Sequence, residues 1–163
     1  AIVGCGSEKL DLSGDTGPVF ISRLYTSNYF ELKREYAKTC CDRYYILSAK
    51  FGLVAPDHSV TESYDLTIDD LDGEVLDEWA DDVGEKLSWF DGDSTLVMLT
   101  GQDYIEPIQG YLEICPPDIE YPFDDTSGIG EQMGWLKDEI EAANAESPVD
   151  DPTDDQSGLG RWA

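Results

Sequence analysis

Hydrophobic positions follow two alternating spacings along the chain. Continuous apolar runs, typical of strands buried on both faces of a sheet, occur at residues 1–6, 43–48 and 95–100. Elsewhere apolar residues recur every three or four positions, which predicts helices near residues 26–41, 67–91, 104–114 and 130–143. A further short strand is predicted at residues 119–123.

This alternation of strand and helix predicts an α/β fold. We expect a three-layer, Rossmann-like domain with a mainly parallel sheet. Residues 1–145 are assigned to this single domain. Residues 146–163 are acidic and contain Pro and Gly, which predicts a flexible tail.

The most informative stretch runs from Tyr44 to Asp65, with the sequence YYILSAKFGLVAPDHSVTESYD. A short strand gives way to turn-permissive residues and then to a long loop without helical periodicity. Ligands of open α/β sheets bind where strands end in loops, and long loops are commonly functional. The stretch therefore predicts a site, against the alternative of a structural crossover with a surface lysine. Its candidate residues are Ser48, Lys50, Gly52, Glu62, Tyr64 and Asp65.

Four other turns add candidates at predicted strand or helix ends. The first strand ends in Gly-Cys-Gly, whose backbone N–H groups could approach a ligand. The helix start near residue 26 combines arginine, aromatics and serine, which suits a stacked base with a phosphate or, equally, core aromatics with a capping serine. Two more glycine-rich turns open the helices near residues 104 and 130, and their N–H groups are predicted to add to an anion-binding site. The candidates from these turns are Cys5, Gly6, Lys9, Arg23, Tyr25, Ser27, Gly101, Gly128 and Gly130.

If these turns meet at one edge of the sheet, their residue types assign roles. Lys9 and Lys50, the lysines in these loops, would hold phosphate, and Tyr25 or Tyr64 would stack a base. A carboxylate beside a lysine and a tyrosine would orient water or accept a proton. The candidate catalytic residues are Lys50, Glu62 and Asp65.

The net charge of −26 must be explained before any single acidic residue is assigned a role. Acids are spread through each segment after residue 50, a pattern that favours a halophilic protein whose carboxylate surface maintains solubility in molar salt. The alternative is a nucleic-acid mimic or a protein with an acidic tail.

Positive charge is distributed differently. The first 50 residues contain seven of the ten Lys and Arg residues but only six of the 36 Asp and Glu residues. Some of these cations have carboxylates at helical spacing, but Lys9, Arg23 and Lys50 lie in predicted loops. Their retention in an acidic chain predicts an anionic ligand, with phosphate the simplest choice.

The four cysteines show no metal-ligand spacing, and the adjacent pair Cys40 and Cys41 suits neither a zinc site nor a disulfide. We expect no metal and no cofactor. Because no base lies near Cys5 in the sequence, a buried strand-end cysteine is favoured over a nucleophile. The chain has no apolar run of membrane-spanning length and no basic region typical of a signal peptide, so a cytoplasmic protein without membrane contact is expected.

In the motifs that contain the candidate site residues, the sequence resembles a small prokaryotic and phage domain family related to the YaaA peroxide-stress proteins. The resemblance covers about residues 1–140 and rests on CGSEKL, LYTSNYF and, most specifically, ILSAKFGLVAPDHSVTESYDLTI. It implies a role near nucleic acid, in DNA binding or protection from oxidative damage. A departure is Gly6-Ser7-Glu8, where the family leads us to expect a more basic run. The residues that the resemblance carries over are Cys5, Lys9, Tyr25, Ser27, Ser48, Lys50, Gly52, Tyr64 and Asp65.

Three functional hypotheses follow. The first is a protein that handles a nucleotide or nucleobase and acts on a nucleic-acid base or its N-glycosidic bond. The second is a non-catalytic module for DNA binding or damage protection that uses the same cations. The third is a scaffold or virus-associated structural protein, in which the strand edge would be filled by packed side chains.

Overall fold

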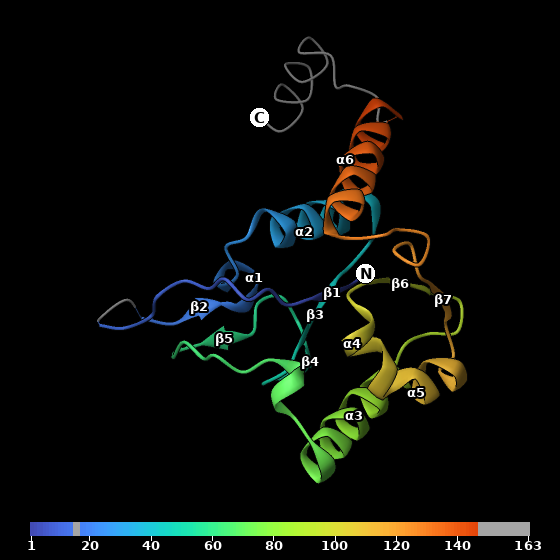
Figure 1. Ribbon diagram of the computed structural model, residues 1–163. Coiled ribbons are helices and arrows are strands. Elements are labelled where there is room, and N and C mark those ends of the chain that lie inside the picture. Colours follow the sequence, from blue (N-terminus) through green and yellow to red (C-terminus); the bar gives the residue numbers. More distant parts are fainter. Residues whose placement is uncertain (15–16, 147–163) are drawn as a thin grey trace, which may run out of the picture.

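A five-stranded sheet forms the centre of the protein, in a computed structural model that describes residues 1–14 and 17–146. Its strands lie in the order β4-β3-β1-β6-β7, and all run parallel except β4, which is antiparallel to β3 (Figure 1). The predicted α/β class and mostly parallel sheet are therefore confirmed. The strands are β1 (Ile2–Gly4), β3 (Tyr45–Ser48), β4 (Gly52–Val54), β6 (Thr95–Leu99) and β7 (Asp118–Glu120).

Helices pack against both faces of this sheet because its strands are apolar on both. Along β1, Ile2 belongs to one hydrophobic cluster and Val3 to another, as expected when successive side chains point to opposite faces. Figure 1 shows α2 and α6 on one side of the sheet and α3 and α5 on the other. The Ile2 cluster includes α3 (Gly73–Leu87), α4 (Gln102–Ile105) and α5 (Gln109–Ile114), and the Val3 cluster includes α1 (Ile21–Leu24), α2 (Asn28–Cys40) and α6 (Ile129–Glu146).

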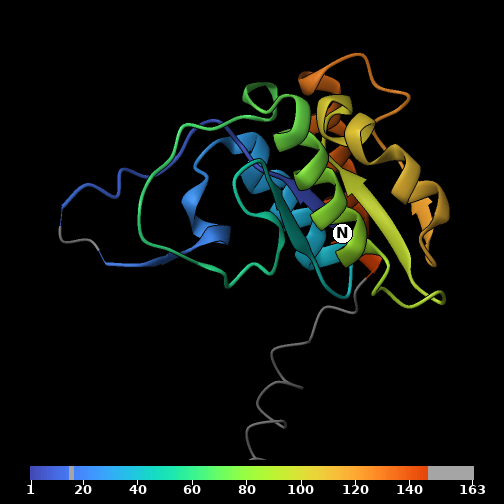
Figure 2. The same ribbon diagram turned by 90° about the horizontal axis from the view of Figure 1, so that it is seen from below.

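A second, two-stranded sheet lies beside the main one and joins two loops. In it, β2 (Val19–Phe20) pairs antiparallel with β5 (Ser59–Val60), within the arm that extends to the left in Figure 2. The Ser63 hydroxyl accepts a hydrogen bond from the Leu12 N–H at 3.0 Å and donates one to the Leu10 carbonyl at 2.9 Å. The loop after β1 is thereby fixed against the loop after β5.

The long loop expected after residue 48 contains two strands, β4 and β5, so that prediction is wrong. Gly52 allows the tight turn into β4 because it adopts a φ of +71°, and a Cβ there would come within 2.9 Å of an Asp82 carboxylate oxygen. The two strands contain only three and two residues, too few to produce an alternating pattern.

Two predicted helices are divided. Residues 67–91 form η1 (Ile68–Asp70) and α3, while residues 104–114 form the end of α4, η2 (Glu106–Ile108) and α5. Pro107 lies at the start of η2, where it lacks the N–H that a continuous α-helix requires. Residues 147–163, which make up nearly all of the predicted tail, lie outside the described residues. In residues 1–14 and 17–146, no helix is both long and apolar enough to cross a membrane.

Candidate functional site

The carboxyl ends of β1, β3 and β6 meet at one edge of the sheet. The Cys5 N–H, just after β1, donates a hydrogen bond to the carbonyl of Leu47 in β3 at 3.0 Å. The Cys5 thiol shares a hydrogen bond of 3.0 Å with the hydroxyl of Tyr104, which follows β6. Gly4 permits this closure because a Cβ at that position would lie 2.3 Å from the Thr100 side chain. Three of the predicted strand-end turns are thus brought together.

Ser48 builds the tip of β3. Its fully buried hydroxyl accepts hydrogen bonds from the backbone N–H groups of Lys50 and Phe51, both at 3.2 Å. The same hydroxyl shares a hydrogen bond of 2.9 Å with Tyr64, and the indole N–H of Trp79 donates to the Ser48 carbonyl at 2.9 Å. Ser48 therefore fixes the turn that presents Lys50.

Two of the predicted tyrosines are joined through their hydroxyl groups. Tyr25 and Tyr64 share a hydrogen bond, but they differ in exposure. Tyr25 is 1% exposed and its ring packs against Phe30 at 4.9 Å between centroids, so it offers a hydroxyl group and no free ring face. The prediction that Tyr25 stacks a base is therefore wrong, because the ring belongs to the core. Tyr64 is half-buried and remains the tyrosine with an accessible ring.

Both predicted phosphate-binding lysines lie against the ring of Tyr64. The ammonium group of Lys9 is 4.7 Å from the ring centroid and that of Lys50 is 5.2 Å from it, within cation–π range. Among the described residues, the single ion pair joins Lys86 to Asp82, so neither Lys9 nor Lys50 is paired with a carboxylate. In a chain with a net charge of −26, this is a local concentration of uncompensated positive charge.

A third lysine, Lys33, lies at the same edge. The sequence analysis had placed it within a helix but had not predicted a role for it in the site. It is 4% exposed, donates a hydrogen bond from its ammonium group to the Gly4 carbonyl at 2.8 Å, and lies 4.4 Å from the Tyr29 ring centroid. Burial lowers its pKa to about 8. The sequence feature that could have identified Lys33 is its position within the apolar stripe of α2, between Phe30 and Tyr36, where a charged residue is rare.

The tyrosine hydroxyls at this edge stay protonated at neutral pH. Burial is the main cause that raises the pKa of Tyr25, Tyr64 and Tyr104, and the nearby Cys5 raises each further. They are therefore hydrogen-bond donors under ordinary conditions. We call this set of side chains the carboxyl-edge cluster: Cys5, Lys9, Tyr25, Lys33, Ser48, Lys50, Tyr64 and Tyr104.

The predicted catalytic carboxylates are not joined to the cluster. Glu62 and Asp65 are exposed, and in the part of the chain that the structure describes they form no ion pair with a lysine. Exposed Arg23, at the end of α1, likewise has no contact that ties it to the cluster in that part of the chain. The carboxylate that does interact electrostatically with Lys33 and Tyr104 is Asp103.

The remaining predicted binding residues have structural roles. The Ser27 hydroxyl caps α2 by accepting from the Phe30 N–H at 3.1 Å, and Gly6 passes close to this cap. At Gly101, the Asp103 carboxylate accepts from the Tyr104 N–H at 3.1 Å. At the start of α6, beside Gly128 and Gly130, the Glu131 carboxylate accepts from the Ser127 N–H at 2.7 Å. The two glycine-rich helix starts therefore already hold a carboxylate where an external anion was predicted, and Gly52 serves the turn into β4.

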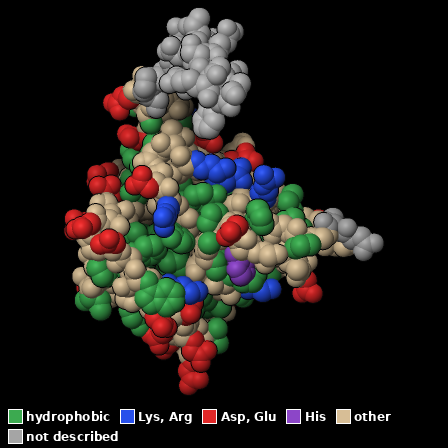
Figure 3. Space-filling view, turned by 180° about the vertical axis from the view of Figure 1, so that it is seen from behind, with side chains coloured by type: hydrophobic (Ala, Val, Ile, Leu, Met, Phe, Trp, Pro, Cys, Tyr) green, Lys and Arg blue, Asp and Glu red, His purple; other side chains and the backbone are tan. Residues whose placement is uncertain are grey.

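No set of three His, Cys, Asp or Glu side chains in residues 1–14 and 17–146 is arranged to hold a metal ion, and all four cysteines are free. Figure 3 shows Lys and Arg side chains in the middle and upper part of one face of the molecule, with Asp and Glu mostly at its margins. On this face, Lys and Arg side chains thus lie mostly inside a border of Asp and Glu side chains.

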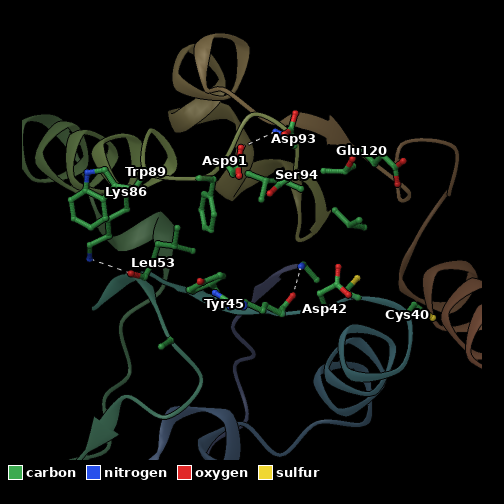
Figure 4. A pocket seen from close by; sticks show the side chains of 18 of the residues that line it. Cys40, Asp42, Tyr45, Leu53, Lys86, Trp89, Asp91, Asp93, Ser94 and Glu120 are labelled. Atoms are coloured by element: carbon green, nitrogen blue, oxygen red, sulfur yellow. Dashed lines mark hydrogen bonds between the residues drawn. The ribbon is translucent and has the colours of Figure 1, made fainter.

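A hollow of about 1050 Å³ lies away from the cluster, at the amino edge of the parallel strands. Figure 4 shows Asp91, Asp93 and Glu120 along its border, opposite Asp42 and Tyr45. Lys86, which lines the hollow, already has partners within the protein. It forms an ion pair with Asp82 at 3.2 Å and donates a hydrogen bond to the Leu53 carbonyl at 3.1 Å.

The fold and these contacts define an α/β protein with lysines, tyrosines and a cysteine gathered at its parallel strand ends. Residues 1–138 match the family of unknown function DUF6884, and the chain belongs to that family. It is 33% identical over 143 residues to the uncharacterised protein YfjM of Bacillus subtilis (strain 168), which covers 86% of this chain and 93% of that protein. No solved structure matches the chain.

Proposed function

We propose that the carboxyl-edge cluster binds an anionic nucleotide and that the protein acts on the base or its N-glycosidic bond. The observation that carries this proposal is the placement of Lys9 and Lys50 on one tyrosine ring without a carboxylate partner. Because both ammonium groups lie within 5.2 Å of one ring centroid, positive charge from two separate loops is concentrated beside Tyr64, where it would attract a phosphate group.

The rest of the cluster supplies groups suited to a base and a sugar. Tyr64 and Phe51 are half-buried, with centroids 5.5 Å apart, and give an apolar aromatic surface. The hydroxyl of half-buried Tyr64, which Ser48 holds in place, is a neutral partner for base or sugar oxygen and nitrogen atoms. A site with charged groups at its rim and aromatic and hydroxyl groups behind them suits a phosphorylated nucleoside better than a simple anion.

Several further expectations belong to this proposal. The helices on both faces of the mostly parallel sheet support a three-layer, Rossmann-like assignment. The resemblance of ILSAKFGLVAPDHSVTESYDLTI to YaaA relatives supports a setting near nucleic acid. The excess of acids supports a halophilic protein of the cytoplasm, where nucleotides are available.

A second candidate is a non-catalytic DNA-binding module. It is favoured by the gathering of Lys and Arg side chains on one face, which would contact several phosphates of one strand. The two functions differ in the smallest ligand that binds. A nucleotide site recognises a mononucleotide, whereas a backbone-binding surface needs an oligonucleotide.

Tryptophan fluorescence can separate the two, because the Trp79 indole is bound to the Ser48 carbonyl within the site. The protein in molar KCl is titrated with nucleoside 5′-monophosphates, the matching nucleosides, free bases and a single-stranded oligonucleotide. We expect each monophosphate that binds to exceed its nucleoside in affinity, and Lys50→Ala to remove that difference. Lys38→Ala, an exposed lysine on the same α2 as Lys33, is the matched control.

Binding of the oligonucleotide alone, weakening steeply with salt, would support the DNA-binding module instead. Release of free base from a bound nucleotide, followed by chromatography, would establish turnover. Absence of binding by all of these ligands would contradict both functions.

A further inference from the structure

The hydroxyl groups of Ser48, Tyr64 and Tyr25 form a hydrogen-bonded chain at the carboxyl edge. Tyr64 is the middle member, since its hydroxyl shares one hydrogen bond with Ser48 at 2.9 Å and another with Tyr25. A hydroxyl group has one proton to donate and two lone pairs with which to accept. The groups around the two ends of the chain therefore fix which hydroxyl donates in each of these hydrogen bonds.

At one end of the chain, Ser48 is the donor. Its oxygen accepts from the backbone N–H groups of Lys50 and Phe51, both at 3.2 Å, and these two hydrogen bonds use both of its lone pairs. Ser48 is fully buried, so its proton needs an acceptor within the protein. That acceptor is the oxygen of Tyr64.

At the other end, Tyr25 is also the donor. It is 1% exposed, and no carbonyl or sulfur atom of the described residues lies at hydrogen-bonding distance from its hydroxyl. Ser48 has no lone pair left, so the Tyr64 oxygen is the acceptor that keeps the buried Tyr25 proton from being unpaired, which would be costly. Burial raises the pKa of Tyr64, whereas its hydrogen bonds with Ser48 and Tyr25 act in the opposite direction, as donors to its oxygen do.

Tyr64 is left with a proton to donate and no free lone pair. Its oxygen accepts from both neighbours, and its own O–H has no acceptor among the described residues. Tyr64 is half-buried, and the ammonium groups of Lys9 and Lys50 beside its ring are themselves donors that cannot accept. An acceptor for the Tyr64 proton therefore comes from solvent or from a ligand.

We propose that Tyr64 determines the ligand specificity of the carboxyl-edge cluster by acting only as a hydrogen-bond donor, and that Tyr25 is the positioning residue that holds it in this role. A ligand that places an acceptor oxygen against the Tyr64 hydroxyl is favoured. A ligand that places an amino group there is rejected, because two donors would face each other. The inference rests on the proposed function for the nature of the ligand and narrows it to a nucleotide with an oxygen, on its base or its sugar, at this point.

Matched pairs of nucleotides test this preference on the intact protein. Uridine and inosine 5′-monophosphates carry a keto oxygen where cytidine and adenosine 5′-monophosphates carry an amino group, and each 2′-deoxynucleotide lacks one sugar oxygen of its ribonucleotide. Affinities in molar KCl are followed by tryptophan fluorescence. In at least one pair we expect the ligand with the oxygen to bind about tenfold more tightly, and Tyr64→Phe to abolish that difference. The pair that responds shows whether the oxygen belongs to the base or to the sugar.

Tyr25→Phe separates a positioning role from a merely structural one. Without the Tyr25 proton, the Tyr64 oxygen regains a lone pair and can accept from an amino group. The preference for the oxygen should therefore fall toward unity because the amino ligand binds more tightly. An equal weakening of both ligands would overturn the positioning role. Tyr45→Phe, at the opposite end of β3, is the matched control and should keep the preference.

The direction of the hydrogen bonds can be measured without any nucleotide. Proton NMR of the protein with 13C-labelled tyrosine identifies hydroxyl protons that exchange slowly with water, and the Tyr→Phe variants assign them. In the free protein we expect a slowly exchanging hydroxyl proton on Tyr25 and a rapidly exchanging one on Tyr64.

These measurements separate the inference from the function on which it rests. A slow proton on Tyr25 in a protein that binds no nucleotide supports the direction of the hydrogen bonds and contradicts the proposed function. A slow proton on Tyr64 in a free protein that binds nucleotides overturns the inference and leaves the proposed function standing. Nucleotide binding whose preferences Tyr64→Phe does not alter, or whose amino ligands are favoured through Tyr64, has the same meaning.

Discussion

The two edges of the parallel sheet differ in almost every respect that matters for function. The amino edge contains the hollow of about 1050 Å³, with four carboxylates in its lining and Trp89 at its border 70% exposed. Its lysine, Lys86, is neutralised by Asp82. The carboxyl edge contains three lysines that form no ion pair within the described residues, together with a thiol and three tyrosines that hydrogen-bond to neighbouring groups.

This difference shows that the size of a hollow is a poor guide to the site in such an acidic protein. Carboxylates cover the molecule in general, so an acidic hollow is ordinary surface. A lysine without an ion-pair partner is not ordinary surface, because it remains unpaired in a chain where carboxylates are abundant. The carboxyl ends of parallel strands are also where side chains from different loops converge. The comparison therefore favours the carboxyl edge over the hollow as the place of the proposed nucleotide site.

Lys9→Ala and Lys50→Ala should each weaken nucleoside monophosphate binding by about 10- to 100-fold, the contribution of a charge-assisted hydrogen bond. The matching nucleoside should bind the variants and the unaltered protein alike. Calorimetric titration gives both affinities. An equal loss for nucleoside and monophosphate would show that the lysines support the loops and do not bind phosphate.

Lys33 should leave a signature in stability as a function of pH. Burial lowers its pKa to about 8 from an ordinary value of 10.5, so between these values the unfolded chain binds more protons at this residue than the folded one. The free energy of unfolding should therefore rise with pH across this window, by up to about 3 kcal/mol. The rise should be absent in Lys33→Met and present in Lys38→Met, as measured by urea denaturation from pH 7 to pH 10. Equal curves for all three proteins would show that Lys33 is not held in a low-dielectric environment.

The smallest effects are expected at the amino edge. Asp93→Asn and Trp89→Ala alter exposed side chains, so stability should stay within about 0.5 kcal/mol. Nucleotide affinity should not change. A loss of nucleotide binding in either variant would move the site to the hollow and reverse the comparison between the two edges.

The sequence was sufficient for the parts of the site that depend on local pattern. Apolar runs followed by turns located the ends of β1, β3 and β6, and loop position singled out Lys9, Lys50 and Tyr64. The N-cap at Ser27 was also predicted as a possible role. These features are encoded by residues adjacent in the chain.

The parts that sequence reasoning missed depend on packing between distant segments. Lys33 joins the cluster because α2 directs its inner face against β1, and Tyr104 reaches Cys5 across a sequence separation of 99 residues. Tyr25 was assigned a stacking role because its burial cannot be read from one aromatic in a turn. Glu62 and Asp65 were chosen for proximity along the loop, but β5 and the turn after it leave both carboxylates exposed.

The most direct measurement is an experimental structure of the protein bound to a nucleoside monophosphate that it recognises. The account predicts phosphate oxygens within hydrogen-bonding distance of the ammonium groups of Lys9 and Lys50. A phosphate bound instead in the amino-edge hollow, beside Arg43 or Lys86, would contradict it.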